Sequence, residues 1–244
     1  MSGDLVSLRM VLVGATAPDQ ALWRQGAEMA ALPVEFSAID LVAARAVLAK
    51  GGADICVVDD SLPAADMAAV IEAARAAKPP PLIFISAAGS ARPDGVDGML
   101  AKPGSRDDAR NLAEICVRAK IPTRVLIVDD SGTMRSIVRK ILSASRFTLH
   151  MHEAAEGFAA LDQLRGGNFG MVFLDYNMPG LNGIETLSEI KRESPNVAVV
   201  MMTSTVDDAI ADRAHASGAL AFLKKPFYPA DIDNVLERYY GLTA

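Results

Sequence analysis

Short apolar segments of strand length alternate with segments of helical periodicity along the whole chain, and this alternation constrains the fold most strongly. It is typical of βαβ units, which build parallel sheets. We therefore predict an α/β protein. In the second half the predicted strands cover 124–129, 147–152, 170–175, 197–203 and 219–223. The predicted helices there cover 132–144, 156–166, 182–194, 206–217 and 229–240.

The first half of the chain repeats this plan. Between its Ala-rich helices, the predicted strands cover 8–14, 33–37, 54–59, 81–86 and 97–101. In both halves the third strand ends at an Asp that lies four residues before a Pro, namely Asp59 and Asp175. A Lys-Pro pair follows the fifth strand in both halves, at Lys102 and Lys225. This ordered set predicts an internal duplication. The two predicted domains are residues 1–120 and 121–244.

The two halves differ between their fourth and fifth strands. Thr203 and Lys225 are 22 positions apart, whereas Ser86 and Lys102 are only 16 positions apart. Several poor helix formers fall into the shorter gap, namely Gly89, Pro93, Gly95 and Gly98. The fourth helix of the first domain is therefore predicted to be very short or missing.

Composition and charge exclude several classes of protein. Hydrophobic residues make up 51% of the chain, which is enough for packed cores, and a net charge of −6 argues against a nucleic-acid-binding surface. No apolar run reaches the roughly 18 residues of a membrane span, and the N-terminus does not resemble a signal peptide. We expect a cytoplasmic protein with no membrane partner. Cys56 and Cys116 are expected to be buried, reduced thiols.

Polar side chains stand where the apolar strands of the second half stop. The pair Asp129 and Asp130 stands at the end of the first strand, Asp175 and Thr203 end the third and fourth strands, and Lys225 follows the fifth. Parallel strands place their carboxyl ends, and hence their sites, at one edge of the sheet. Like charges about 4 Å apart repel by roughly 4 kcal/mol at an effective dielectric of about 20, so three carboxylates there require a counter-ion. Oxygen ligands suit Mg²⁺.

This set of strand-end residues resembles the receiver domain of two-component response regulators, over roughly residues 124–244. Within it, residues 130–139 look most like those of the chemotaxis regulators. The resemblance implies a flavodoxin-like fold for each of the two tandem domains, a five-stranded parallel sheet with (βα)5 order. It also implies that Asp175 accepts a phosphoryl group from a histidine kinase or a phosphotransfer protein. Mg²⁺ would be held by Asp129, Asp130, Asp175 and the backbone carbonyl of Asn177.

The resemblance assigns three further residues of the second domain. Thr203 and Lys225 would bind the phosphoryl oxygens, and Phe222 stands at the position of the aromatic switch residue. The peptide bond before Pro226 is often cis in this family. The protein would not be an enzyme, apart from its own phosphorylation and a slow autodephosphorylation. Haloacid-dehalogenase-type phosphatases are disfavoured, because they carry an acid where this chain has Asn177.

The first domain lacks part of this set. Gly14 and Ala15 replace the acid pair, and Met99 replaces the switch aromatic. The counterparts of the phosphoacceptor, the hydroxyl and the lysine remain, as Asp59, Ser86 and Lys102. We predict a degenerate pseudo-receiver in which Asp59 and Lys102 form a structural pair, and we expect it to bind no Mg²⁺. The competing possibility is that this domain still accepts phosphate weakly.

The sequence therefore predicts a tandem-receiver response regulator without a separate output domain. It would signal through altered contacts with a downstream protein target and would not bind nucleic acid directly. Two alternatives stay open from the sequence. The chain could be a docking scaffold or phosphate sink built on the pseudo-receiver, or it could be the receiver portion of a longer regulator with an output domain elsewhere.

Overall fold

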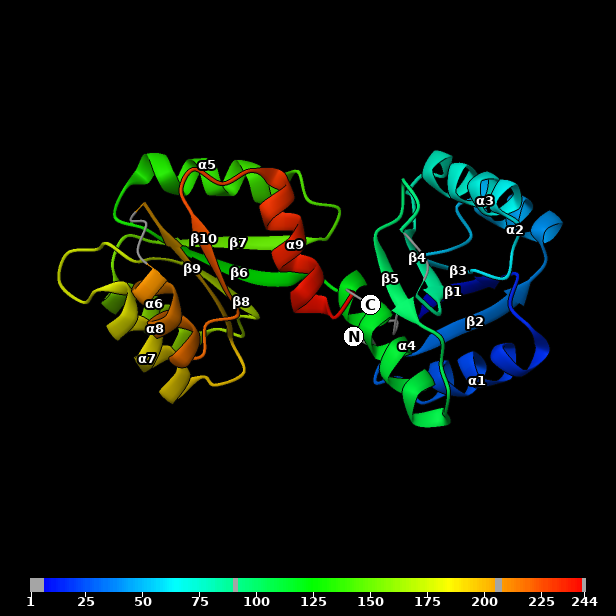
Figure 1. The fold of residues 1–244 in the computed structure, drawn as a ribbon, viewed down its shortest axis with the longest axis horizontal. Helices are drawn as coiled ribbons and strands as arrows, with labels where there is room; N and C mark the ends of the chain where they lie inside the picture. The colour runs from blue at the N-terminus through cyan, green and yellow to red at the C-terminus, as the bar shows by residue number, and fades with distance from the viewer. Residues whose placement is uncertain (1–6, 90–91, 205–207, 243–244) are drawn as a thin grey trace, which may run out of the picture. The chain divides into compact units, whose positions relative to one another are not determined.

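The computed structural model describes residues 7–89, 92–204 and 208–242 of the chain (Figure 1). The chain divides into two compact units. The first unit comprises Met1–Ile121 with Tyr240–Ala244, and the second comprises Pro122–Tyr239. Near the end of the chain, Leu242 belongs to the first unit, where its carbonyl accepts a hydrogen bond from the Met99 amide at 3.0 Å.

The first unit is an α/β sandwich around a parallel sheet. Its elements are β1 (Leu8–Val13), α1 (Ala17–Glu28), β2 (Val34–Ile39), α2 (Leu41–Ala49), β3 (Ile55–Asp59), α3 (Ala64–Ala76), β4 (Leu82–Ala87), β5 (Gly98–Ala101) and α4 (Arg106–Lys120). The described strands pair in the order β2-β1-β3-β4-β5, all in parallel. Helices α1 and α4 pack together on one face, and α2 and α3 pack together on the other (Figure 1).

The second unit repeats this topology. Its elements are β6 (Thr123–Val128), α5 (Gly132–Ser143), β7 (Leu149–Ala154), α6 (Gly157–Gly166), β8 (Met171–Asp175), α7 (Gly183–Glu193), β9 (Ala198–Thr203), α8 (Asp208–Ala216), β10 (Ala221–Lys224) and α9 (Pro229–Tyr240). The parallel strands pair in the order β10-β9-β8-β6-β7. This is the strand order of a flavodoxin-like sheet. The predicted fold class of two tandem flavodoxin-like domains is confirmed.

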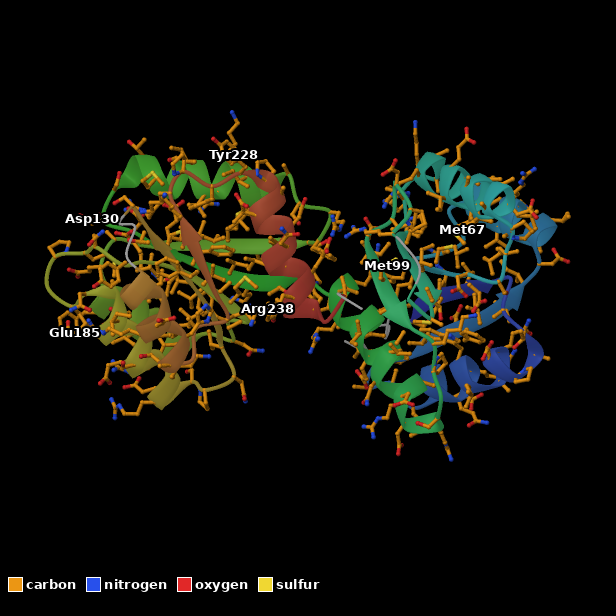
Figure 2. All side chains as sticks on the ribbon, in the orientation of Figure 1. Met67, Met99, Asp130, Glu185, Tyr228 and Arg238 are labelled. Carbon is orange, nitrogen blue, oxygen red and sulfur yellow. The ribbon has the colours of Figure 1, made fainter. Side chains whose placement is uncertain are left out.

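The central strands explain why the apolar runs in the sequence are continuous rather than alternating. Every residue of β3 and of β8 is buried, because helices cover both faces of the sheet. The edge strand β2 instead alternates between half-buried and exposed positions along most of its length. Side chains of β3 and β8 belong to the hydrophobic cores of their units. Met99 lies on the edge strand β5 of the first unit (Figure 2).

Local signals set the ends of the helix that follows Asp175. Asn182 caps α7 by accepting from the Glu185 amide at 3.0 Å, and the Glu185 carboxylate accepts from the Asn182 amide, which forms a capping box. The helix ends at Glu193, two residues before Pro195. Leu187 and Ile190 are fully buried, as their helical spacing in the sequence requires.

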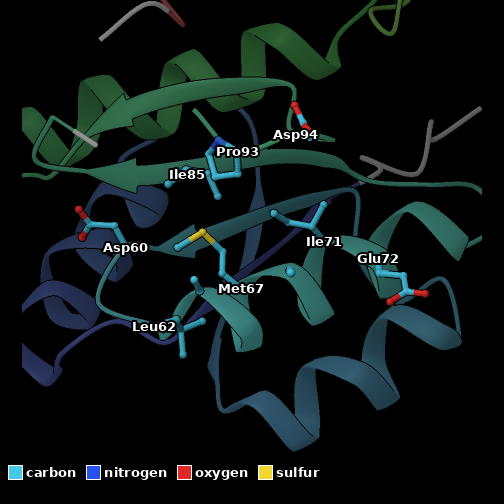
Figure 3. A pocket seen from close by; sticks show the side chains of 10 residues that line it. Asp60, Leu62, Met67, Ile71, Glu72, Ile85, Pro93 and Asp94 are labelled. Carbon is cyan, nitrogen blue, oxygen red and sulfur yellow. The ribbon is translucent and has the colours of Figure 1, made fainter. Parts of the chain in front are cut away.

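The first unit lacks one helix that the second unit has. Helix α8 lies between β9 and β10, but the described residues form no helix between β4 and β5. The predicted loss of this helix is thus seen in the described part of the chain. Its absence leaves α3 and β4 bordering a groove (Figure 3).

Two further expectations concern the cysteines and the helices. Cys56 and Cys116 are free and buried, and burial raises the pKa of the Cys56 thiol to about 12. None of the helices formed by the described residues is long and apolar enough to cross a membrane.

Candidate functional site

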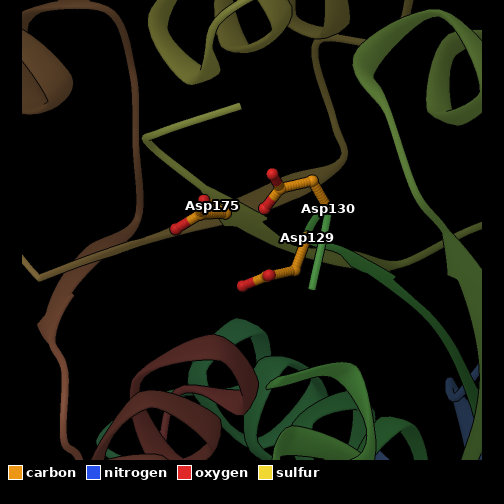
Figure 4. Close-up of side chains that lie close together, drawn as sticks. All are labelled: Asp129, Asp130 and Asp175. Atoms are coloured by element: carbon orange, nitrogen blue, oxygen red, sulfur yellow. The ribbon is translucent and has the colours of Figure 1, made fainter. Parts of the chain in front are cut away.

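Three carboxylates meet at the carboxyl edge of the second sheet. Asp129 and Asp130 directly follow β6, and Asp175 is the last residue of the neighbouring strand β8. One carboxylate oxygen from each residue lies within 4.8 Å of the others (Figure 4). Asp129 and Asp175 are buried, whereas Asp130 is exposed. The parallel strand order therefore brings together acids that are 45 positions apart in the sequence.

Lys225 neutralises part of this charge. Its Nζ donates to Asp129 Oδ2 at 2.6 Å and to Asp175 Oδ1 at 2.7 Å. Burial alone would lower the pKa of Lys225, but the hydrogen bonds to the two carboxylates raise it overall. The lysine is therefore held in its charged form. The Lys225–Pro226 peptide bond is cis.

The electrostatics of Asp175 differ from those of an exposed carboxyl group. Burial raises the pKa of Asp175, and the negative charges of Asp129 and Asp130 raise it further, while Lys225 opposes them. The net shift is upward, so the folded protein disfavours the ionised form of Asp175. An additional cation at this edge would relieve that cost.

The acid loop is anchored by residues to which the sequence analysis gave no role. Arg135 on α5 donates from Nη1 to the Asp129 carbonyl at 2.8 Å and from Nε to Glu153 at 2.9 Å. The amide of Ser131 donates to Asp129 Oδ1 at 2.9 Å. Ser131 also caps α5 by accepting from the Met134 amide. The position of Arg135 one turn after the acid pair, on a capped helix, is the only sequence signal for this anchor.

A pocket of about 500 Å³ opens over the acids. The predicted residues Asp129, Asp130, Asp175, Asn177 and Lys225 all line it. Its remaining walls are mostly apolar and come from Met134, Ile137, Pro226 and Phe227. Beyond the pocket lining, Tyr228 stands exposed on the surface of the second unit (Figure 2). The site thus combines a charged floor with an apolar rim, and the rim was not predicted.

The two predicted switch residues lie outside this lining. Thr203 is fully buried at the end of β9, where its carbonyl accepts from the Lys225 amide at 2.6 Å, and its neighbour Ser204 lines the pocket instead. Phe222 on β10 is half-buried, packs against the core and borders a separate groove next to α9. The backbone thus links Thr203 directly to Lys225, while Phe222 faces a different surface.

The acid cluster fits a divalent cation. In the described part of the chain it is the one group of three or more His, Cys, Asp or Glu side chains that could hold a metal ion. Its donors are carboxylate oxygens, which Mg²⁺ prefers, and an exposed acid beside two buried ones leaves room for bound water.

Removing the charge of Asp175 is expected to stabilise the metal-free protein. In Asp175→Asn the free energy of unfolding at pH 7 in EDTA should rise by about 1 kcal/mol, because one member of a repelling carboxylate cluster is gone. Because the folded-state pKa of Asp175 is raised, the cost of ionising it exists above that pKa and disappears as the pH falls through it. The gain should therefore shrink toward acid pH. Urea titrations over a pH series measure it.

The exposed acid Asp212 on α8 offers the matched control for this stability measurement. Asp212→Asn should leave the free energy of unfolding unchanged within error, since it removes an equal charge outside the cluster. A loss of stability in Asp175→Asn would mean that its bond to Lys225 outweighs the repulsion.

In the first unit, Lys102 is the counterpart of Lys225, but it pairs with only two acids. Lys102 Nζ lies 2.9 Å from Asp59 Oδ1 and 2.7 Å from Asp60 Oδ1. Burial alone would lower the pKa of Lys102, but hydrogen bonds to Asp60 and Asp59 raise it overall. Asp59 and Ser86 are both fully buried and are register partners in neighbouring strands. The lysine here bridges two consecutive residues, the last of β3 and the one after it, whereas Lys225 bridges acids at the ends of two different strands.

A leucine side chain occupies the place of the missing acid. Gly14 has φ of +83°, and a Cβ built on it would lie 2.2 Å from Leu62 Cγ. The Ser61 hydroxyl closes the same corner by donating to the Gly14 carbonyl at 2.9 Å. A side chain at position 14 cannot enter this space while Leu62 fills it. The first unit thus has the apolar side chain of Leu62 next to Gly14, the position that corresponds in sequence to Asp129.

Comparison with known proteins gives consistent similarities. A sequence profile described as "Response regulator receiver domain" matches residues 125–237. The chemotaxis protein CheY-3 of Vibrio cholerae is 34% identical over 119 residues, which cover 48% of this chain and 91% of that protein. The chemotaxis protein CheY of Pseudomonas aeruginosa is 35% identical over 125 residues, which cover 48% of this chain and 99% of that protein.

A likeness of fold extends over both units. The structure of a probable two-component system response regulator/GGDEF domain protein matches 96% of this chain and 99% of that chain, with a TM-score of 0.54 and 23% sequence identity.

Proposed function

The chain belongs to the response regulator receiver family, and on that basis we propose that it is a phosphoacceptor of two-component signal transduction with Asp175 as its phosphorylation site. The observation that carries the proposal is the convergence of Asp129, Asp130, Asp175 and Lys225 in one open pocket. The phosphoryl donor would be a histidine kinase or a phosphotransfer protein. A receiver domain of this kind is not generally classed as an enzyme.

The proposed reaction is transfer of a phosphoryl group from a phosphohistidine to Asp175. A carboxylate oxygen of Asp175 forms the new P–O bond while the P–N bond to the donor imidazole breaks, and the leaving nitrogen takes a proton from solvent. Lys225, already 2.7 Å from Asp175 Oδ1, would pair with the negative charge of the transferred oxygens. Asp129, Asp130, Asp175 and the backbone carbonyl of Asn177 would hold Mg²⁺, which neutralises charge during phosphoryl transfer.

The apolar rim of the pocket supports a protein as the donor. Ile137 is 45% exposed on α5 and lines the same pocket as Asp130. An exposed aliphatic side chain beside a charged site is suited to contact a second protein during transfer.

We assign the output to a changed protein-contact surface. Thr203 would turn its hydroxyl toward the phosphoryl group, and Phe222 would follow into the vacated space. The backbone bond from the Lys225 amide to the Thr203 carbonyl ties the two phosphoryl-binding residues together and supports this coupling. The surface affected would be that of β10 and α9, where Phe222 borders a groove. The phosphoryl group can shift the balance between the two conformations of this surface only if it makes better contacts with one of them than with the other.

Thr203→Ala is expected to accept phosphate and yet change the β10–α9 surface less. Allosteric couplings of this type are typically about 1–3 kcal/mol. Loss of the Thr203 hydroxyl should therefore reduce the phosphorylation-dependent difference in amide hydrogen exchange several-fold. Hydrogen-exchange mass spectrometry of phosphorylated and unphosphorylated protein measures it at β10 and α9. The control is Ser204→Ala, which alters the neighbouring hydroxyl. Undiminished differences in Thr203→Ala would remove Thr203 from the switch.

We further propose that the first unit is a pseudo-receiver that neither binds Mg²⁺ nor accepts phosphate. Gly14 and Ala15 stand where the second unit has its acid pair, and Leu62 fills the space that a side chain at position 14 would enter. Among the described residues, three carboxylates that could hold a metal ion come together in the second unit and not in the first.

The direct test of the proposed function is phosphotransfer. Histidine kinases from the same genome, radiolabelled on their phosphohistidine, are mixed one at a time with the full chain and Mg²⁺. Rapid movement of label from one kinase to this chain supports the proposal. Failure of every kinase to transfer label, with a known receiver labelled in parallel, would argue for a docking scaffold.

A further inference from the structure

A groove on the first unit lies where that unit lacks a helix. Its volume is about 510 Å³, and it runs beside α3, β4 and the connection to β5 (Figure 3). Its apolar lining comes from Leu62, Met67, Ile71, Ile85 and Pro93. This groove contains no residue of the phosphorylation site, which lies in the other unit.

The second unit shows what covers the corresponding face. There α7 packs against α6 on one side and against α8 on the other, and Ala214 of α8 is fully buried. In the first unit α3 packs against α2, and the described residues supply no helix to its other side. A short amphipathic helix is therefore the element that this side of the fold accommodates.

The wall of the groove is fixed by hydrogen bonds. Arg75 on α3 donates from Nε to the Gly95 carbonyl at 2.9 Å and from Nη2 to Asp97 at 2.6 Å. The buried Asp97 carboxylate in turn accepts from the Ile83 amide of β4 at 2.7 Å. These bonds hold the connecting segment against α3 and β4. The groove is thus formed in advance, which lowers the cost of binding.

The rim of the groove is acidic. Glu72 and Asp94 are exposed at its edge, and Asp60 also lines it. The basic side chains beside it form bonds within the first unit. Lys102 bonds to Asp60 at 2.7 Å, Arg75 bonds to Asp97, and the exposed Arg92 donates to the Val96 carbonyl at 2.8 Å. An apolar floor with an acidic rim is complementary to an apolar stripe flanked by Lys or Arg.

We propose that this groove binds a basic amphipathic helix of a partner protein, in the position that α8 occupies in the second unit. The partner's apolar side chains would enter the cavity between Met67, Ile71 and Pro93. Its basic side chains would face Glu72 and Asp94. The first unit would then serve as an adaptor, and its binding would not require phosphate.

The test uses the full chain and a fluorescent synthetic peptide of about 15 residues, long enough to form a helix, with Leu and Ala on one face and Lys on the other. An acidic twin carries Glu in place of every Lys. Fluorescence anisotropy is expected to show binding of the basic peptide and little binding of the twin. Ala68→Arg, at an exposed lining position of α3, should weaken binding about tenfold or more, because it fills the groove and adds positive charge. Glu72→Lys should weaken it about threefold.

Matched controls separate a groove effect from a general one. Ala65→Arg places the same side chain on the same helix outside the groove lining, and Glu28→Lys reverses an exposed charge on α1. Both should bind the peptide like the unaltered chain. The fluorescence of the single, buried Trp23 reports whether each variant keeps the first unit folded.

Four outcomes would overturn the proposal. The first three are no binding of the basic peptide, equal binding of the acidic twin, and equal loss in Ala65→Arg and Ala68→Arg. The fourth is a dimer of the unaltered chain, seen by analytical ultracentrifugation, that Ala68→Arg dissociates. That result would make a second copy of this chain the occupant of the groove.

Discussion

Asp175→Asn is expected to abolish stable phosphorylation of the chain by acetyl phosphate in the presence of Mg²⁺. The substitution removes the nucleophilic oxygen, and the loss of an enzyme's nucleophile can cost about a millionfold in rate. Asp175 ends β8 with its carboxylate in the pocket and Lys225 2.7 Å away, and it is the acid that the proposed function assigns as the phosphorylation site. Intact-protein mass spectrometry at successive times after the addition of acetyl phosphate measures the phosphorylated fraction.

Asp59→Asn is the matched control, because Asp59 ends the equivalent strand of the first unit and also contacts a lysine. It should leave the phosphorylated fraction unchanged. If Asp59→Asn removed most of the phosphate, the first unit would be the active receiver and our assignment would be reversed. Persistent labelling of Asp175→Asn at an unaltered rate would instead sink the proposed function itself. Neither result bears on the groove, whose peptide binding is measured without phosphate.

The second large effect concerns Mg²⁺. Asp130→Ala is expected to weaken Mg²⁺ binding about tenfold or more, since it removes a unit charge next to a divalent ion. Asp130 should matter most because Lys225 bonds to Asp129 and Asp175, whereas Asp130 is the exposed acid of the cluster. Isothermal titration calorimetry gives the affinity, and thermal unfolding with and without Mg²⁺ gives an independent measure through linkage.

Asp60→Ala provides the control for metal binding, since Asp60 follows the counterpart acid of the first unit and bonds to Lys102. Its Mg²⁺ affinity should equal that of the unaltered chain. An equal loss of affinity in Asp60→Ala and Asp130→Ala would show that both units hold metal, contrary to the proposed asymmetry.

The sequence was sufficient to predict the sheets and the acid cluster because both depend on local patterns. Buried parallel strands read as unbroken apolar runs, as in Val172-Phe173-Leu174, and the polar residue that ends each run marks the edge of the sheet. The topology then brings those ends together without further information. Local sequence also predicted that the first unit lacks a helix between its fourth and fifth strands, because Pro93 and the glycines around it are poor helix formers.

Features that depend on side-chain packing across elements could not be predicted. The anchor from Arg135 to the Asp129 carbonyl requires knowledge of where α5 sits on the sheet. The groove at Met67 depends on how the segment before β5 lies once its helix is gone. The place of Thr203, fully buried and outside the pocket lining, likewise follows from the path of β9 rather than from its residue type.

The leucine beside Gly14 makes the difference between the two units hard to reverse. Restoring an acid at position 14 alone would drive its Cβ into Leu62, whose Cγ lies 2.2 Å from that point, and would place a non-glycine residue at φ of +83°. Replacing Leu62 first would remove its apolar contacts with the core of the first unit, with no new activity to compensate for them. Each single step toward a working site therefore costs stability before it returns any benefit. An engineer who wishes to revive the first unit must change the loop after β1 and the turn after β3 together.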